Sequence, residues 1–175
     1  DDYKGRTPAA IQDIMSSNRI VLGPAFKAHR QQLEKENPKI TRDELTRAMY
    51  QEYIKGYYRL VKSVDDNVGR VLDYLDETGL ADNTLVIYTS DQGFSLGEHG
   101  FYNKQWMYEE PLHQPLLVRL PGNVARGSVQ NSMVNHVDLA PTILEYAGLP
   151  IPDDMQGRSL KVILEDKADK VRDAS

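Results

Sequence analysis

Residues 83–91, NTLVIYTSD, decide the fold of this chain. Residues 85–88 form a continuous apolar run, which then gives way to polar residues and ends at Asp91. A short apolar run of this kind is typical of a strand covered on both faces, as in a parallel sheet between helices. We therefore expect a buried strand at 85–88, with Asp91 just beyond its carboxyl end.

A long helix is predicted upstream of this strand, over residues 41–79. Thr41 and Glu44 fit a capping box, in which each side chain satisfies a free backbone N–H of the first turn. Gly79 is placed to end the helix, and Gly56 or Gly69 is expected to bend or interrupt it. Apolar residues then recur in steps of four and three, which predicts one buried face: Tyr50, Ile54, Tyr57, Val61, Val64, Val68, Val71 and Leu75. A helix that leads into a buried strand is half of an α/β unit.

The remaining segments complete a single-domain prediction. Residues 1–40 are expected to be a loop-rich lead-in, with a helix start at Thr7-Pro8 and a charged helical piece at 27–36. Residues 84–164 are expected to hold the first strand, a polar loop, a second strand at 115–120 ended by Pro121-Gly122, and an exit helix. That helix should begin near Pro141, with Asp138 as its cap and Gly148 at its end. Residues 152–167 are expected to be mostly loop, with a helical turn or two.

The composition excludes several classes of function. The 175 residues suit one sizeable domain, and the net charge of −5 argues against a nucleic-acid or anionic-membrane partner. No apolar run approaches the roughly 20 residues that a membrane helix needs. Cysteine is absent, which removes disulfides, thiolate metal sites and cysteine nucleophiles.

The loop after Asp91 concentrates chemistry. Asp91 and Gln92 offer a carboxylate and an amide oxygen, a hard donor pair suited to Ca²⁺ or Mg²⁺ rather than Zn²⁺. Gly93 is expected to let the backbone turn sharply past this pair. Lys104 would add positive charge for an anionic group, and His99 could donate a hydrogen bond or a proton. Taken one by one, these residues are more often an ordinary turn after a strand and a solvated lysine than a metal or anion site.

Several other polar residues are assigned structural roles. Glu109 and Glu110 are expected to form salt bridges or to contact the site residues without binding the metal or the substrate themselves. His29, His113 and His136 are interpreted as structural or surface residues. Asp65 and Asp66 on the long helix are expected to bind backbone or arginine rather than metal.

Read together, the residues resemble a known family. The segment YTSDQGFSLGEHGFYNKQWMYEEPLHQPLLVRLPG (88–122) looks like the second half of the catalytic domain of the sulfatase family, within the alkaline-phosphatase-like superfamily. Its flanks, YYRLVKSVDDNVGRVLDYLDETGLADN before it and VNHVDLAPTILEYAGLPIPDDMQGRSL after it, are similar to the lead-in and exit of that family. The match covers roughly residues 45 to 164 in order.

The resemblance implies a fold and roles for single residues. The fold is α/β, part of a mostly parallel sheet flanked by helices, truncated at both ends relative to the family. Asp91 and Gln92 correspond to ligands of an active-site Ca²⁺, Lys104 to the lysine that contacts the sulfate group, and His99 to a residue near the pocket. The substrate would be a sulfated carbohydrate, such as a glycosaminoglycan, or another sulfate ester, and the compartment periplasmic, secreted or lysosomal-type.

The family's nucleophile is a formylglycine made inside a Cys/Ser-x-Pro-x-Arg motif, and no such motif occurs in these 175 residues. The resemblance therefore implies an internal excerpt of a longer sulfatase, with an incomplete calcium site and no activity by itself.

Two alternatives remain. Relatives in the superfamily cleave phosphate monoesters, phosphate diesters or phosphonates, often with two zinc ions, although Gln92 fits a two-zinc site poorly. The chain could also be a non-catalytic α/β module that self-associates through bare apolar faces.

Overall fold

The computed structural model describes residues 24–104 and 106–173. They form two compact units, the first built from residues 24–68 and 92–114 and the second from residues 69–91 and 115–173. Each unit is described by itself. The helix start predicted at Thr7-Pro8 lies outside the described residues.

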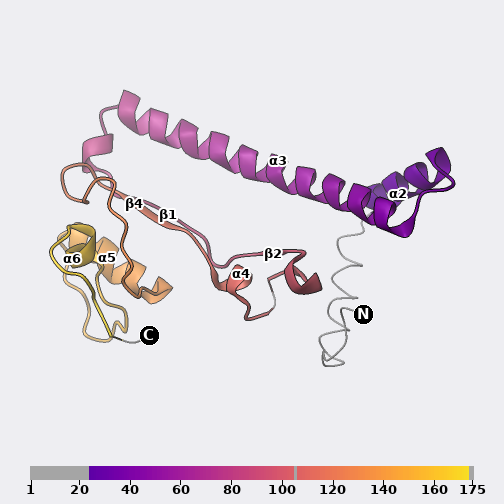
Figure 1. Ribbon diagram of the computed structural model, residues 1–175. Helices are drawn as coiled ribbons and strands as arrows, with labels where there is room; N and C mark the ends of the chain where they lie inside the picture. The colour runs from indigo at the N-terminus through magenta and orange to yellow at the C-terminus, as the bar shows by residue number, and fades with distance from the viewer. Residues whose placement is uncertain (1–23, 105, 174–175) are drawn as a thin grey trace. The chain divides into compact units, whose positions relative to one another are not determined.

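The longest element is helix α3, Arg42–Glu77 (Figure 1). Its capping box is confirmed, because the Thr41 N–H donates to Glu44 Oε2 at 2.9 Å and the Glu44 N–H donates to Thr41 Oγ1 at 3.3 Å. Its end is also confirmed: Gly79 has a φ of 69°, and the Leu80 N–H donates to the Leu75 carbonyl at 2.9 Å. The predicted interruption at Gly56 or Gly69 is wrong, since α3 runs through both glycines as one helix.

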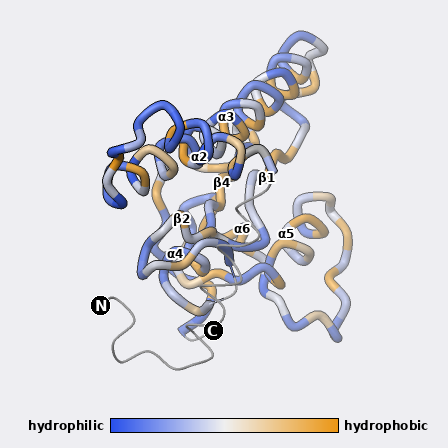
Figure 2. The backbone as a smooth tube through the Cα atoms, turned by 90° about the vertical axis from the view of Figure 1, so that its right-hand side faces the viewer, coloured by the Kyte–Doolittle hydropathy of each residue, from blue (hydrophilic) through white to orange (hydrophobic). Residues whose placement is uncertain are grey.

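The apolar stripe predicted along α3 exists in the sequence but is only partly buried. Hydrophobic and hydrophilic segments alternate along the turns of α3 in Figure 2. Val61, Val64 and Val71 are 46%, 50% and 58% exposed, whereas Ile54 and Leu75 are half-buried. The prediction of one continuous buried face is therefore wrong for the described part of the chain, because no described element packs over these three valines.

The first unit contains α2, Pro24–Glu36. The helix predicted at 27–36 is therefore confirmed, but it begins at Pro24, within the stretch that was expected to be loop. It also contains a small antiparallel hairpin of β2, Ser95–Leu96, and β3, Tyr102–Asn103. The short helices η2, Glu98–Gly100, and α4, Glu109–Leu112, complete it. Its core is centred on Phe101, which is 2% exposed and packs against Trp106 with ring centroids 5.3 Å apart.

The second unit contains η1, Ala81–Asn83, and the strands β1, Val86–Thr89, and β4, Leu116–Arg119. These strands lie side by side (Figure 1) and pair antiparallel, with Val86 opposite Arg119 and Thr89 opposite Leu116. Both predicted strands are confirmed in position, but the described sheets are antiparallel pairs, so the expected parallel pairing is not found here. An antiparallel pair needs no crossover helix, and here the chain between β1 and β4 holds β2, η2, β3 and the short helix α4.

The rest of the second unit consists of η3, His136–Asp138, α5, Leu139–Tyr146, and α6, Lys161–Leu164. The exit helix begins at Leu139, two residues before the predicted Pro141. Gly148, with a φ of 69°, ends it as predicted. No helix in the described residues is long and apolar enough to cross a membrane.

Candidate functional site

Asp91 lies exposed two residues after the end of β1, as predicted. The residue before it is held from a distant part of the second unit, because His136 Nε2 lies 2.7 Å from the Ser90 carbonyl oxygen. This hydrogen bond requires the proton on Nε2. Ser90 Oγ also reaches Asp91 Oδ1 at 3.4 Å. His136 therefore fixes the strand end that carries Asp91, a contact consistent with its interpretation as a structural or surface residue.

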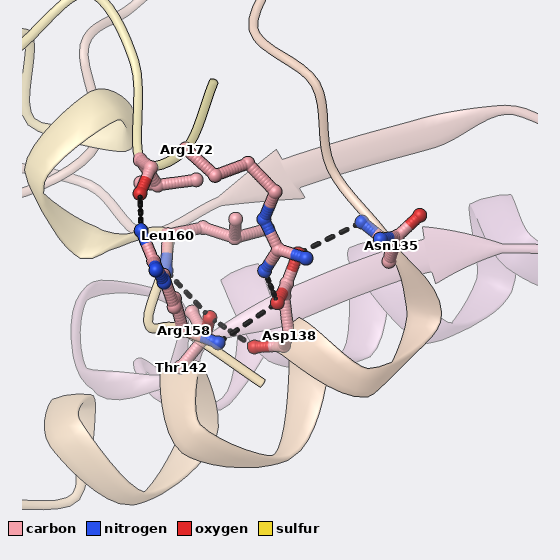
Figure 3. A network of polar contacts seen from close by, with 7 residues as sticks. Asn135, Asp138, Thr142, Arg158, Leu160 and Arg172 are labelled. Carbon is pink, nitrogen blue, oxygen red and sulfur yellow. Dashed lines mark hydrogen bonds and ion pairs between the residues drawn. The ribbon is translucent and has the colours of Figure 1, made fainter. Parts of the chain in front are cut away.

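Asn135 and Asp138, which form a capping box around the turn that carries His136, belong to a buried polar network (Figure 3). Asp138, fully buried, accepts from the Asn135 N–H and from the Arg158 N–H, both at 2.8 Å, and forms an ion pair with the Arg172 guanidinium. Asp138 occupies the N-cap position of α5, as predicted, but its side chain makes no capping hydrogen bond to that helix. Instead, Asp138 is the third residue of a capping box that starts at Asn135 and joins this turn to the carboxyl-terminal segment.

A second layer of this network lies beside Asp138. Thr142 accepts from the Leu160 N–H at 2.8 Å and donates to the Asp138 carbonyl at 2.5 Å (Figure 3). Arg158 donates from its guanidinium to the Val171 carbonyl at 2.9 Å. These contacts tie α5, α6 and the last described residues together around one carboxylate.

In the first unit, Gly93 is held against α4. Its N–H donates to the Pro111 carbonyl at 2.7 Å, and a Cβ at this position would lie 1.9 Å from the Glu110 carbonyl oxygen and 2.6 Å from that of His113. Gly93 is not among the glycines with positive φ. Close backbone approach, rather than the predicted sharp turn, is therefore what requires glycine here.

His99 sits in the turn of the hairpin with a left-handed backbone, φ 55° and ψ 14°. Its ring stacks on Tyr108 with centroids 4.6 Å apart, and its Nε2 lies 3.3 Å from Glu110 Oε1. The second oxygen of Glu110 is buried and has no hydrogen-bond partner within the described part of the chain. Glu110 thus lies against the His99 ring and orients it, in line with the supporting role predicted for this glutamate.

Lys104 is exposed just beyond β3, and its ammonium makes no ion pair with a described residue. In the hairpin, Ser95 pairs with Asn103, so the next residues outward, Phe94 and Lys104, lie at the same open end. An aromatic and a cationic residue therefore flank the last hairpin pair, one on each strand.

The four predicted site residues divide between the units. Gln92, His99 and Lys104 belong to the first, and Asp91 to the second. No cluster of three or more His, Asp or Glu that could hold a metal occurs in the described residues. Asp91 and Gln92 have the hard-oxygen chemistry that Ca²⁺ takes, but they are fewer than the six to eight ligands it needs.

The first unit also contains a pocket that was not predicted from the sequence, which we term the aromatic pocket. It measures about 600 Å³ and is lined by rings of Phe26, Tyr53, Tyr57 and Phe94, together with His29 and Glu52. The rings of Tyr57 and Phe94 lie 6.0 Å apart. The alternation of aromatic residues near the start of α3 was the available signal, but it was interpreted as part of the core stripe.

Tyr53 contributes a half-buried phenol to this pocket. It packs edge-on against Tyr102, with centroids 5.2 Å apart. Burial first, and then the neighbouring Tyr102 and Tyr57, raise the pKa of Tyr53 to about 12. Its phenol therefore keeps its proton at physiological pH and remains a hydrogen-bond donor.

Comparison with known proteins places these features in a family. The family profile described as "N-sulphoglucosamine sulphohydrolase, C-terminal" matches residues 97–175. An N-acetylglucosamine-6-O-sulfatase of Bacteroides thetaiotaomicron is 48% identical over 118 residues, 67% of this chain and 21% of that protein. The chain belongs to the sulfatase family. An extracellular sulfatase homologue of Drosophila melanogaster is 42% identical over 114 residues, which cover 65% of this sulfatase chain and 10% of that protein.

Solved structures of related proteins also match this chain. One, described as a complex with its substrate D-glucosamine-2-N,6-O-disulfate, matches 80% of this chain and 28% of its own, with 43% identity and a TM-score of 0.73. A phosphonate monoester hydrolase from Silicibacter pomeroyi matches 75% of this chain and 25% of its own, with 35% identity and a TM-score of 0.66. The α/β class is confirmed, and the sulfatase chain spans less than a third of each of these relatives.

Proposed function

We propose that the full-length protein carrying this segment is a sulfuric ester hydrolase that acts on a sulfated amino sugar in a carbohydrate. The observation that carries the proposal is the 48% identity to an N-acetylglucosamine-6-O-sulfatase over 118 residues. Residues 1–175 would form part of its catalytic domain, with the lead-in at 1–40, the long helix at 41–79 and the site-bearing region at 84–164. In that domain β1 would join a mostly parallel sheet, and the protein would be exported to a periplasmic, extracellular or lysosomal-type compartment.

Asp91 and Gln92 would hold a Ca²⁺ ion together with ligands from other parts of the protein. When bound, the ion would supply positive charge that stabilises the sulfate oxygens. The support for Asp91 is its exposure at a strand end that His136 fixes. The support for Gln92 is the close attachment of the neighbouring Gly93 to α4.

Lys104 would bind the sulfate group, since its exposed ammonium carries a full positive charge on a hairpin end. His99 would donate a hydrogen bond or a proton within the same pocket. Glu110 supports this role, because its carboxylate oxygen lies 3.3 Å from His99 Nε2 and helps to fix the orientation of the ring.

The decisive test uses the full-length protein with a panel of esters: a 6-O-sulfated N-acetylglucosamine, an aryl sulfate, an aryl phosphate diester and an aryl phosphonate. We expect the two sulfates to be hydrolysed fastest. Lys104→Met should lower kcat/KM for both sulfates by about 10²-fold or more, as expected for a lost charge contact in the transition state. Lys39→Met, which removes another exposed lysine, should leave both values unchanged.

A second candidate comes from one observation, the 35% identity to a phosphonate monoester hydrolase. The same panel separates the two. A phosphonate or phosphate diester cleaved with a higher kcat/KM than either sulfate would reject the sulfatase assignment and favour this candidate.

A further inference from the structure

We propose that the aromatic pocket is a carbohydrate subsite, which holds the pyranose ring next to the sulfated residue that Lys104 contacts. The inference rests on the proposed function, because it takes the substrate to be a sulfated carbohydrate. The aromatic pocket is distinct from the proposed metal and sulfate site, because its lining comes from α2, α3 and Phe94.

The hairpin register links this pocket to the sulfate-binding lysine. Ser95 pairs with Asn103, so Phe94, which lines the pocket, and Lys104 lie at the same open end of β2 and β3. Gln92 lies only two residues before Phe94. A sugar whose sulfate reaches Lys104 would therefore extend its next ring toward the pocket within the first unit.

The chemistry of the lining suits a sugar ring. Aromatic faces pack against the C–H groups of a pyranose, and rings come from three separate segments: Phe26 of α2, Tyr57 of α3 and Phe94 of the loop. A volume of about 600 Å³ lies in the range of small-ligand sites, which are mostly apolar with a few polar groups. Phe94 is 36% exposed, so the rings are accessible from solvent.

The polar groups of the pocket match sugar hydroxyls. Glu52 can accept hydrogen bonds, and His29 and the protonated Tyr53 can donate them. Glu52 also lies 3.6 Å from the Arg59 guanidinium, so its negative charge is balanced. An anionic oligosaccharide would therefore not be repelled here. These features favour a carbohydrate over a purely apolar ligand.

The test is calorimetric binding to the full-length protein. The probes are a tetrasaccharide that contains 6-O-sulfated glucosamine and the corresponding sulfated monosaccharide. Wild type should bind the tetrasaccharide at least tenfold more tightly. Tyr57→Leu should weaken tetrasaccharide binding about tenfold, because one aromatic contact of roughly 1.4 kcal/mol is lost, and should leave monosaccharide binding unchanged.

Tyr74→Leu is the matched control, since Tyr74 is on the same helix, 60% exposed and outside the pocket. It should change neither affinity. Glu52→Gln leaves the ring packing intact and should weaken tetrasaccharide binding threefold or more, so the test does not depend on how well Tyr57→Leu folds.

The inference is overturned if wild type binds both probes equally, as it would if the protein's own residues fill the pocket. It is equally overturned if both pocket variants match the control. Failure of the proposed function has a different signature. Binding that depends on Tyr57 without hydrolysis of any sulfate ester would reject the sulfatase activity while supporting the subsite.

Discussion

The buried carboxylate of Asp138 offers the sharpest test of what holds the second unit together. Asp138→Asn keeps the size of the side chain, so it opens no cavity, but it removes the charge that faces Arg172. The Arg172 side chain is only 10% exposed and Asp138 is fully buried, so the guanidinium would remain in a poorly solvated place without a counter-charge. The amide would also present a donor to groups that are themselves donors.

The expected magnitude follows from these contacts. Removing one partner of a buried ion pair costs about 3 to 5 kcal/mol, because the other charge is left uncompensated. The Asn135 and Arg158 N–H groups, each 2.8 Å from an Asp138 oxygen, report directly on this loss. Their hydrogen-exchange rates should rise by roughly two to four orders of magnitude, since each 1.4 kcal/mol is a factor of ten.

The assay is hydrogen exchange of these two amides in wild type and variants of the full-length protein. The control is Asp173→Asn, whose carboxylate is 84% exposed in an ion pair with Lys170 and should contribute at most about 1 kcal/mol. The double variant Asp138→Asn with Arg172→Met should recover part of the protection, because no buried charge is then left unpaired. Exchange in Asp138→Asn that matches the Asp173→Asn control would refute the reasoning.

Three further predictions test other features. Gly93→Ala should destabilise the protein by about 3 kcal/mol in urea unfolding, since its Cβ would lie 1.9 Å from the Glu110 carbonyl oxygen, which is backbone and cannot rotate away. Gly69→Ala, in an open helical position, should instead stabilise it by roughly 1 kcal/mol, and equal effects would contradict the close-approach argument. Ca²⁺ should raise the melting temperature of the wild-type full-length protein and not of Asp91→Asn; an equal rise in both would remove Asp91 from the ligand set. The isolated 175-residue chain should self-associate in light scattering, and Val64→Lys, on a helix face that is 50% exposed there, should reduce this; a monomeric wild-type chain would reject the prediction.

The features that could be predicted from the sequence are those that short-range chemistry decides. The capping box of Thr41 and Glu44 needs only two residues at the right spacing, and it forms as expected. Gly79 and Gly148 end their helices with positive φ, because a left-handed backbone at a helix end strongly favours glycine. The strand predicted at 85–88 is found at 86–89, because an apolar run of only about four residues suits a strand better than a helix.

The features that failed depend on partners far along the chain. The apolar stripe shows which face of α3 is apolar, but the burial of that face depends on what packs over it. Val61 and Val71 have no such cover in the described residues. Strand direction in β1 likewise depends on its neighbour, β4. Asp138 before a helix is most often a cap, yet its partners Arg158 and Arg172 lie 20 and 34 residues downstream, where no local rule reaches.

The contrast between local chemistry and partners far along the chain also applies to the candidate site. Residue type alone indicated Asp91 and Gln92 as oxygen donors, but residue type cannot show how the peptide between them is held. A hydrogen bond anchors the chain on each side of the pair: His136 binds the Ser90 carbonyl in the second unit, and Pro111 accepts from the Gly93 N–H in the first. Each partner is distant in sequence from the residue it holds. Because sites whose ligand groups are held by surrounding contacts bind more precisely, these two anchors support the proposed calcium site from outside its ligand set.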